Sequence, residues 1–230
     1  TTSINQDYAR IIGLELGINY RVGKYIRTFV NGAYQVATGK SNSAAESLLQ
    51  IRQTGFVNTT KEQYLAWDRP WDFKGGVIFT ADSTIRIGKI PLNGFRVFIT
   101  GTYKSGLRYT PHELTSQTDI GRPIYTPLVD QPFAEVGKDW HWVDLRLTRD
   151  FVTKKNRGVS LSVEVKNVFN TLNSQIINPV TGRAYEVGDP VPEDWRDPAF
   201  PNPLDGGLLP TDPARFTPGR QILYGASFRF

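Results

Sequence analysis

The chain has 230 residues, of which 39% are hydrophobic and none is cysteine, and its formal net charge is +5 at pH 7. The missing cysteines exclude disulfides, thiolate metal sites and a cysteine nucleophile, and the mild, dispersed charge forms no basic run of the kind that binds nucleic acid. No stretch approaches the roughly 18 consecutive apolar residues of a membrane helix, and the polar first residues lack the pattern of a secretory signal peptide. We therefore expect either a cytoplasmic protein or a piece of a longer one.

The dominant pattern along the chain is the alternation of apolar with small or polar residues, which indicates β-strands. The first run shows it clearly, because Leu14, Leu16 and Ile18 share one parity while Glu15 lies on the other. Seven such runs predict strands in this order: residues 10–22, 25–37, 72–82, 94–108, 140–151, 158–168 and 220–230. None of the 15 prolines falls inside a run, as expected where backbone N–H groups pair in a ladder. The only helical pattern is the short stretch 42–53.

The connections between these runs alternate in length. The short ones are a tight turn near Gly23, about ten residues after the third run, and the stretch TKKNRG after the fifth. The long ones are residues 39–71, 109–139 and 170–219. Short turns at one end and long loops at the other are typical of a transmembrane β-barrel, and each run has about the 9–11 residues that a tilted membrane strand needs. We therefore expect an all-β, antiparallel barrel in a bacterial outer membrane, with the long loops extracellular.

Charged residues recur on the polar side of successive runs, which suits a watered barrel lumen better than a soluble sandwich. The predicted lumen-facing residues are Glu15, Arg96, Asp144, Arg146, Glu164 and Lys166. Either they pair across neighbouring strands to satisfy the inner wall, or they line a functional path.

Large aromatic residues gather at the ends of the runs, as in the aromatic girdles of membrane barrels. They are Tyr20, Tyr25, Trp71, Tyr103, Tyr109, Trp140, Trp142, Phe151 and Phe169. A soluble β-domain that binds a small ligand remains the alternative fold. Seven strands cannot close an antiparallel barrel, which needs an even number, so we expect these strands to be part of a larger one.

Several segments resemble TonB-dependent outer-membrane receptors. YLAWDRPWDFKGGVIF is similar to the entry into one of their late barrel strands, although Trp71 stands where they usually carry histidine. YKSGLRYTP is similar to their Tyr-x-Ser-Gly-x-x-Tyr-Thr-Pro element, and WVDLRLTRDF followed by VSLSVEVKNVFNTLN is the closest match. PGRQILYGASFRF resembles their closing strand with its terminal aromatic residue.

This resemblance covers nearly the whole chain and implies that its strands are the last seven of about 22, the size of plugged transporters. It also implies import of a scarce nutrient, such as a siderophore, vitamin, glycan or peptide. The expected partners are outer-membrane lipid, the rest of the barrel with its plug domain, and TonB through an N-terminal region, with a surface lipoprotein as the partner in the scaffold alternative. It implies no enzyme activity and no cofactor. The functional alternative is a scaffold barrel whose long loops dock a surface protein without transport.

Two sets of residues are candidate sites. Five loop aromatics have no visible core to fill, so they could stack on a ligand or pack within their own loops: Tyr109, Tyr125, Phe133, Trp195 and Phe200. The resemblance makes the end of the chain a barrel-assembly signal, carried by Tyr224, Phe228 and Phe230. The two histidines, His112 and His141, have no third ligand at metal-binding spacing, so we expect no metal site.

Overall fold

The computed structural model describes residues 8–40, 62–152, 157–192 and 213–229. Within these ranges the chain is all-β with antiparallel pairing, which confirms that part of the expected fold class. One 3-10 helix, η2 (Pro213–Arg215), precedes the last strand. No helix in the described ranges is long and apolar enough to cross a membrane.

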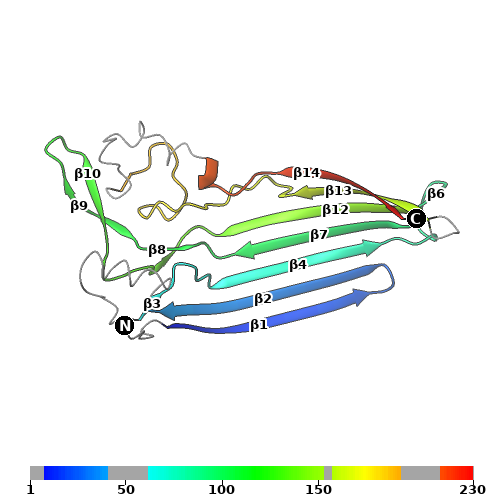
Figure 1. The fold of residues 1–230 in the computed structure, drawn as a ribbon, viewed down its shortest axis with the longest axis horizontal. Coiled ribbons are helices and arrows are strands. Elements are labelled where there is room, and N and C mark those ends of the chain that lie inside the picture. The colour runs from blue at the N-terminus through cyan, green and yellow to red at the C-terminus, as the bar shows by residue number, and fades with distance from the viewer. Residues whose placement is uncertain (1–7, 41–61, 153–156, 193–212, 230) are drawn as a thin grey trace, which may run out of the picture.

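Seven long strands form one sheet, and each lies next to its neighbour in the sequence (Figure 1). In sheet order they are β1 (Ala9–Val22), β2 (Ile26–Gly39), β4 (Trp71–Thr80), β7 (Phe95–Lys104), β12 (Trp140–Val152), β13 (Gly158–Lys166) and β14 (Gln221–Arg229). They overlap the seven ranges expected from alternation. A short strand, β3 (Gln63–Tyr64), pairs with the end of β2.

Six further short strands lie in the connections and pair as three small ribbons. They are β5 (Arg86–Ile87) with β6 (Ile90–Pro91), β8 (Arg108–Tyr109) with β11 (Glu135–Val136), and β9 (His112–Gln117) with β10 (Pro123–Pro127). Three prolines lie in these ribbons, each at the end of an edge strand where a missing N–H group is tolerated. Alternation cannot reveal such strands, because most are only two residues long.

The fourth expected strand, 94–108, divides into β7 and β8 because the chain leaves the ladder after Lys104. Ser105 closes the end of the neighbouring strand, since its N–H donates to the carbonyl of Trp71 at 2.8 Å and its Oγ accepts from the N–H of Trp71 at 3.0 Å. Gly106 then passes so close to another backbone that a Cβ atom there would lie 2.1 Å from the carbonyl oxygen of Gly137.

The strand register divides the sheet into two faces. Side-chain direction alternates along a strand, so residues paired across a ladder point to the same side. One row of paired residues crosses the whole sheet: Tyr20, Thr28, Val77, Ile99, Leu145, Val165 and Ile222. We call the side of this row the apolar face and the other the polar face. All six predicted lumen residues lie on the polar face: Glu15, Arg96, Asp144, Arg146, Glu164 and Lys166.

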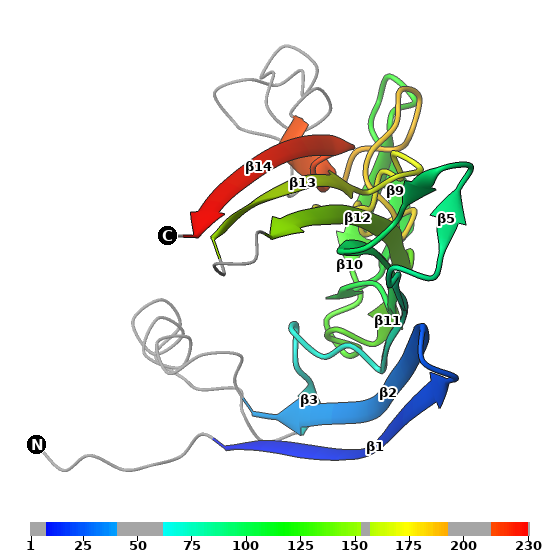
Figure 2. The ribbon, with the colours of Figure 1, turned by 90° about the vertical axis from the view of Figure 1, so that its right-hand side faces the viewer.

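The sheet is curved into an open arc with β1 and β14 at its two ends (Figure 2). Each of these edge strands pairs with only one neighbour, so the described sheet does not close into a barrel. The described parts of the three long connections gather at one end of the strands, which we call the loop end. The short connections lie at the opposite end, which we call the turn end (Figure 1).

At the turn end, Lys24 in the β1–β2 turn reaches Asp82 just after β4, with Nζ and Oδ2 3.0 Å apart. The pKa of Asp82 is lowered to about 2, first by the hydroxyl of Thr84, which donates to its Oδ1 at 2.5 Å, and then by the hydrogen bond from Lys24. The carboxylate of Asp82, which stays ionised at neutral pH, therefore links the β1–β2 turn to the turn after β4.

Candidate functional site

The apolar face is the largest feature that the described fold leaves uncovered. Its side chains are exposed along every long strand; Leu14 is 78% exposed and Tyr224 is 80% exposed. A soluble monomer rarely exposes a contiguous apolar patch of more than a few hundred Å². A surface that extends over seven strands therefore needs a cover, and lipid or another protein layer would provide it.

Aromatic rings border the apolar face at the loop end. The rings of Tyr34, Trp71, Phe73 and Tyr103 form a chain across β2, β4 and β7, with successive centroids 4.5, 5.5 and 6.1 Å apart. The residues between this border and the turn end are mostly aliphatic, such as Val77 on β4. Trp71 to Phe79 is nine residues of β4, which matches the roughly 9–11 residues of a tilted membrane strand.

A second aromatic border lies at the turn end of the same face. By register and parity it contains Tyr20, Phe79, Phe95, Phe151 and Phe228. Two bands of aromatic residues around an aliphatic belt resemble the apolar band and aromatic girdles on the outer surface of membrane barrels. Apolar alternation alone does not require this arrangement.

Two tryptophans predicted for the girdle are placed differently. Trp140 and Trp142 share parity with Asp144 on β12, so they lie on the polar face. The indole N–H of Trp140 donates to the carbonyl of Ser174 at 2.7 Å, and the guanidinium of Arg69 lies 3.9 Å from the centre of its ring. These two rings therefore lie on the polar face at the loop end, and the girdle prediction is wrong for them, because a position at a strand end does not determine which face a ring is on.

Ion pairs and hydrogen bonds connect strands on the polar face. Arg96 bonds Asp150 at 2.7 Å. The pair Lys104–Asp72 also measures 2.7 Å. Arg146 is the register partner of Glu164. Partly exposed pairs of this kind contribute about 0–1 kcal/mol each, so their main effect is to favour one register.

Two of the predicted lumen residues lie together in a hollow at the loop end of the polar face. The hollow has a volume of about 380 Å³. It is lined by Trp140, Trp142, Asp144, Lys166, Asn167, Asn173, Thr217, Pro218, Gly219 and Gln221. Asp144 is partly engaged, because its Oδ1 accepts the N–H of Asn167 at 2.8 Å. Lys166 makes no ion pair with the described residues. Glu15, which lies on the same face but outside the hollow, makes none with them either. The hollow thus offers indole rings and an available ammonium group.

A buried ion pair organises the first two long connections. Arg108 Nε donates to Asp68 Oδ2 at 2.6 Å, and the two side chains are 7% and 0% exposed. Asp68 also accepts the N–H of Ala37 on β2 at 2.9 Å, and Arg108 lies over the ring of Tyr64 at 3.6 Å. Asp68 bonds both the backbone of β2 and the side chain of Arg108 on β8, so the pair connects the end of β2 to β8.

Two glycines, Gly137 and Gly182, let the second and third connections stack backbone against backbone. Gly137 donates to the carbonyl of Leu107 at 2.9 Å, and Lys138 donates to the carbonyl of Gly182 at 2.8 Å. Gly182 has a φ of 71°, and a Cβ atom there would lie 2.8 Å from the hydroxyl oxygen of Tyr109. Burial, and secondarily the nearby charge of Glu135, raise the pKa of the Tyr109 phenol.

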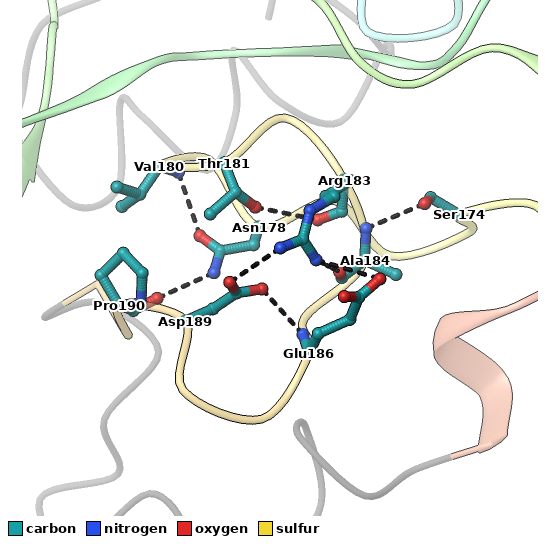
Figure 3. Close-up of polar contacts among 9 residues, drawn as sticks. All are labelled: Ser174, Asn178, Val180, Thr181, Arg183, Ala184, Glu186, Asp189 and Pro190. Atoms are coloured by element: carbon teal, nitrogen blue, oxygen red, sulfur yellow. Dashed lines mark hydrogen bonds and ion pairs between the residues drawn. The ribbon is translucent and has the colours of Figure 1, made fainter.

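The third connection contains a compact loop built around Asn178, which is completely buried (Figure 3). Its amide donates to the carbonyl of Pro190 at 2.8 Å, and its carbonyl oxygen accepts the N–H of Val180 at 3.0 Å. Arg183 closes the loop by pairing with Asp189 at 2.9 Å and with Glu186 at 3.2 Å. The loop end is therefore a connected platform, which we call the loop platform; it comprises the described residues 62–70, 105–111, 133–139 and 173–192.

The predicted loop aromatics are not one cluster. Tyr109 and Phe133 lie within the loop platform, where both are half-buried; Tyr109 pairs with Glu135, and the carbonyl of Phe133 accepts from Arg108. Tyr125 is on the separate β9–β10 ribbon. Trp195 and Phe200 lie outside the described residues. Packing within the loops therefore accounts for Tyr109 and Phe133, and ligand stacking by any of these residues stays a prediction.

The candidate assembly residues Tyr224 and Phe228 project from β14 on the apolar face and are exposed, while Phe230 lies outside the described residues.

No group of three or more histidine, cysteine or acidic residues within the described ranges could hold a metal ion. In comparisons with known proteins, no protein-family model, curated protein or solved structure matches this chain.

Proposed function

We propose that this chain supplies seven consecutive strands of a transmembrane β-barrel in a bacterial outer membrane, and that the barrel is a TonB-dependent nutrient transporter. One observation carries the barrel proposal. The register places an aliphatic belt on a single face of all seven strands and borders it with aromatic rings, on β2, β4 and β7 at the loop end and on β1, β4, β7, β12 and β14 at the turn end. Lipid is the cover that suits an apolar surface of this shape.

The two open edges support a barrel larger than the described sheet. Unpaired backbone N–H and C=O groups are very costly in hydrocarbon, so a membrane sheet must close on itself. β1 and β14 run in the same direction, because six antiparallel steps separate them. They cannot pair with each other in an antiparallel ladder, so closure requires an odd number of further strands between them.

Transport is supported by the resemblance of four segments, in order, to TonB-dependent receptors, and by the polar face. In such a barrel the polar face lines the lumen that holds the plug. The hollow beside Trp142 and Lys166 then lies at the extracellular end of that lumen, where a nutrient would enter. The resemblance implies no single nutrient, so the proposed cargo is a siderophore, vitamin, glycan or peptide.

A scaffold barrel that docks a surface protein is the second candidate, and the loop platform favours it. A platform tied by the buried Arg108–Asp68 pair and the Asn178 loop presents a fixed surface, as a docking site would. A soluble β-domain is disfavoured by the extent of the apolar face.

The test separates these functions in cells that make the whole protein carrying this chain. A barrel should appear in the outer-membrane fraction and migrate faster on a detergent gel before boiling than after it. A transporter should also be needed for growth on a limiting nutrient, and the growth should be lost in cells without TonB. TonB-independent growth together with a normal barrel would favour the scaffold. Recovery of the whole protein as a detergent-free soluble monomer would refute both membrane proposals.

A further inference from the structure

A small hairpin at the turn end has an apolar face of its own. β5 and β6 pair Ile87 with Ile90, and Leu92 donates to the carbonyl of Ile85 at 2.9 Å, which extends the ladder by one pair. These four aliphatic side chains therefore share one side of the hairpin. Ile87 and Ile90 are 68% and 58% exposed. Gly88, with a φ of 61°, provides the tight turn between them.

The hairpin is also positively charged. It carries Arg86 and Lys89, both exposed and neither in an ion pair with the described residues. No acidic residue occurs from position 83 to position 94. Two carboxylates beside the hairpin are already bound. Asp82, which precedes it in sequence, is paired with Lys24, and Asp150, whose N–H donates to the carbonyl of Gly94 at 2.9 Å, is paired with Arg96. The hairpin thus combines an exposed aliphatic pair with two unneutralised cations.

Arg149 joins this hairpin to the apolar face. Its register partners are Phe95 and Leu161, so it is a cation on the apolar face, in the aromatic border at the turn end. Its Nη2 donates to the carbonyl of Pro91 at 3.2 Å, and its guanidinium lies 5.0 Å from the ring centre of Phe151. Its Nε is buried and has no hydrogen-bond partner among the described residues. In Figure 2 the hairpin, marked by β5, stands on the outer side of the arc.

We propose that the β5–β6 hairpin and Arg149 form a binding site for an anionic phospholipid at the turn end of the barrel. Ile87 and Ile90 lie at the level of the upper acyl chains, next to the aliphatic belt. Arg86, Lys89 and Arg149 hold the phosphate of the headgroup, as basic side chains at a membrane interface do.

The occupant follows from the combination of apolar and cationic groups on one small hairpin. A free phosphate ion would leave the aliphatic pair in water. An acidic protein would have to contact the apolar face beside the hairpin, and in the proposed barrel lipid already covers that face. An anionic lipid satisfies both requirements, since aliphatic side chains enter the bilayer boundary while basic ones stay at the headgroups. This inference rests on the proposed function, because it needs the apolar face to contact lipid.

The test uses the whole purified barrel protein and measures the dissociation constant of phosphatidylglycerol by native mass spectrometry. The double variant R86Q/K89Q removes two exposed cations without touching the long strands. The matched control is R21Q/R27Q, because Arg21 and Arg27 are register partners at the same end but on the polar face. Each cation near a membrane surface changes binding about fivefold, so R86Q/K89Q should weaken phosphatidylglycerol binding by about 25-fold. R21Q/R27Q should leave it unchanged, and Arg149→Gln should weaken it about fivefold.

Equal weakening by R86Q/K89Q and R21Q/R27Q would overturn the inference, because general charge rather than a site would then be responsible. Displacement of phosphatidylglycerol by excess inorganic phosphate would overturn it too, since the aliphatic pair would then have no part. The expected result also includes unchanged binding of neutral phosphatidylcholine. All variants should migrate as folded barrels. If even the unaltered protein is not a membrane barrel, the proposed function fails, whereas a normal barrel with unchanged lipid binding defeats only this inference.

Discussion

Replacing Val163 by arginine tests the assignment of the two faces most directly. Val163 lies on β13, pairs with Leu147 and Tyr224, and belongs to the apolar face. It is four residues, or about 13 Å along the strand, from Val159, which pairs with Phe228 of the turn-end border. In the proposed barrel, that distance places it near the middle of an apolar belt about 25 Å tall. An arginine at this depth should cost roughly 2–4 kcal/mol, against about 0–1 kcal/mol near an interface.

Two matched variants on the same strand separate facing from depth. Ser162→Arg adds the same side chain one residue away on the polar face, beside Gly225, and should be tolerated. Val159→Arg keeps the apolar facing but lies at the aromatic border, so it should cost about 1 kcal/mol or less. The measurement is the guanidinium unfolding midpoint of the whole protein in lipid vesicles, supported by the folded fraction on a detergent gel. Equal losses at positions 162 and 163 would refute the assigned facing, and equal losses at 159 and 163 would refute the assigned depth.

Three further predictions concern the two ends of the sheet. Asp68→Asn leaves the buried guanidinium of its partner uncompensated and should destabilise the loop platform by about 3–5 kcal/mol, seen as faster proteolysis in the long connections of the folded barrel. Gly106→Ala places a Cβ atom against backbone and should cost about 1–3 kcal/mol, while Gly101→Ala, with open space around it, should be tolerated; similar unfolding midpoints for the two would contradict the backbone stacking. Because the pKa of Asp82 is lowered, its contact with Lys24 contributes above the ordinary pKa and is lost as the pH falls through about 2; a carboxyl NMR titration midpoint near 3.8 would contradict the contact.

The long strands were predictable because a period of two persists over nine or more residues in each. That signal is strong at a two-faced sheet, where a slip of one residue would exchange the faces. Strand ends were less certain, since alternation does not reveal where a chain leaves the ladder. Ser105 and Gly106 show why: the departure depends on Trp71 and Gly137, which are distant in sequence.

The loop platform was not predictable from local pattern. Asp68 and Arg108 are 40 positions apart, and neither lies in a recognisable motif for an ion pair. The position of Trp140 and Trp142 at the start of a strand predicts the girdle, whereas their parity with Asp144, equally visible in the sequence, predicts the polar face that they occupy. For aromatic residues at strand ends, parity therefore deserves more weight than position.

The aromatic border at the turn end supports a barrel independently of hydrophobicity. Phe79 shares a row of paired residues with Val22 at one edge and Tyr224 at the other. The border residues on the edge strands are instead Tyr20, two residues toward the loop end, and Phe228, four residues toward the turn end. The border thus slants by about one residue for each strand crossed. With strands about 4.8 Å apart and a rise of about 3.3 Å per residue, that slant corresponds to a strand tilt of about 35°. Membrane barrels tilt their strands by about 35–45°. The aromatic border would therefore lie parallel to the bilayer surface only if these strands crossed the bilayer with the tilt of barrel strands.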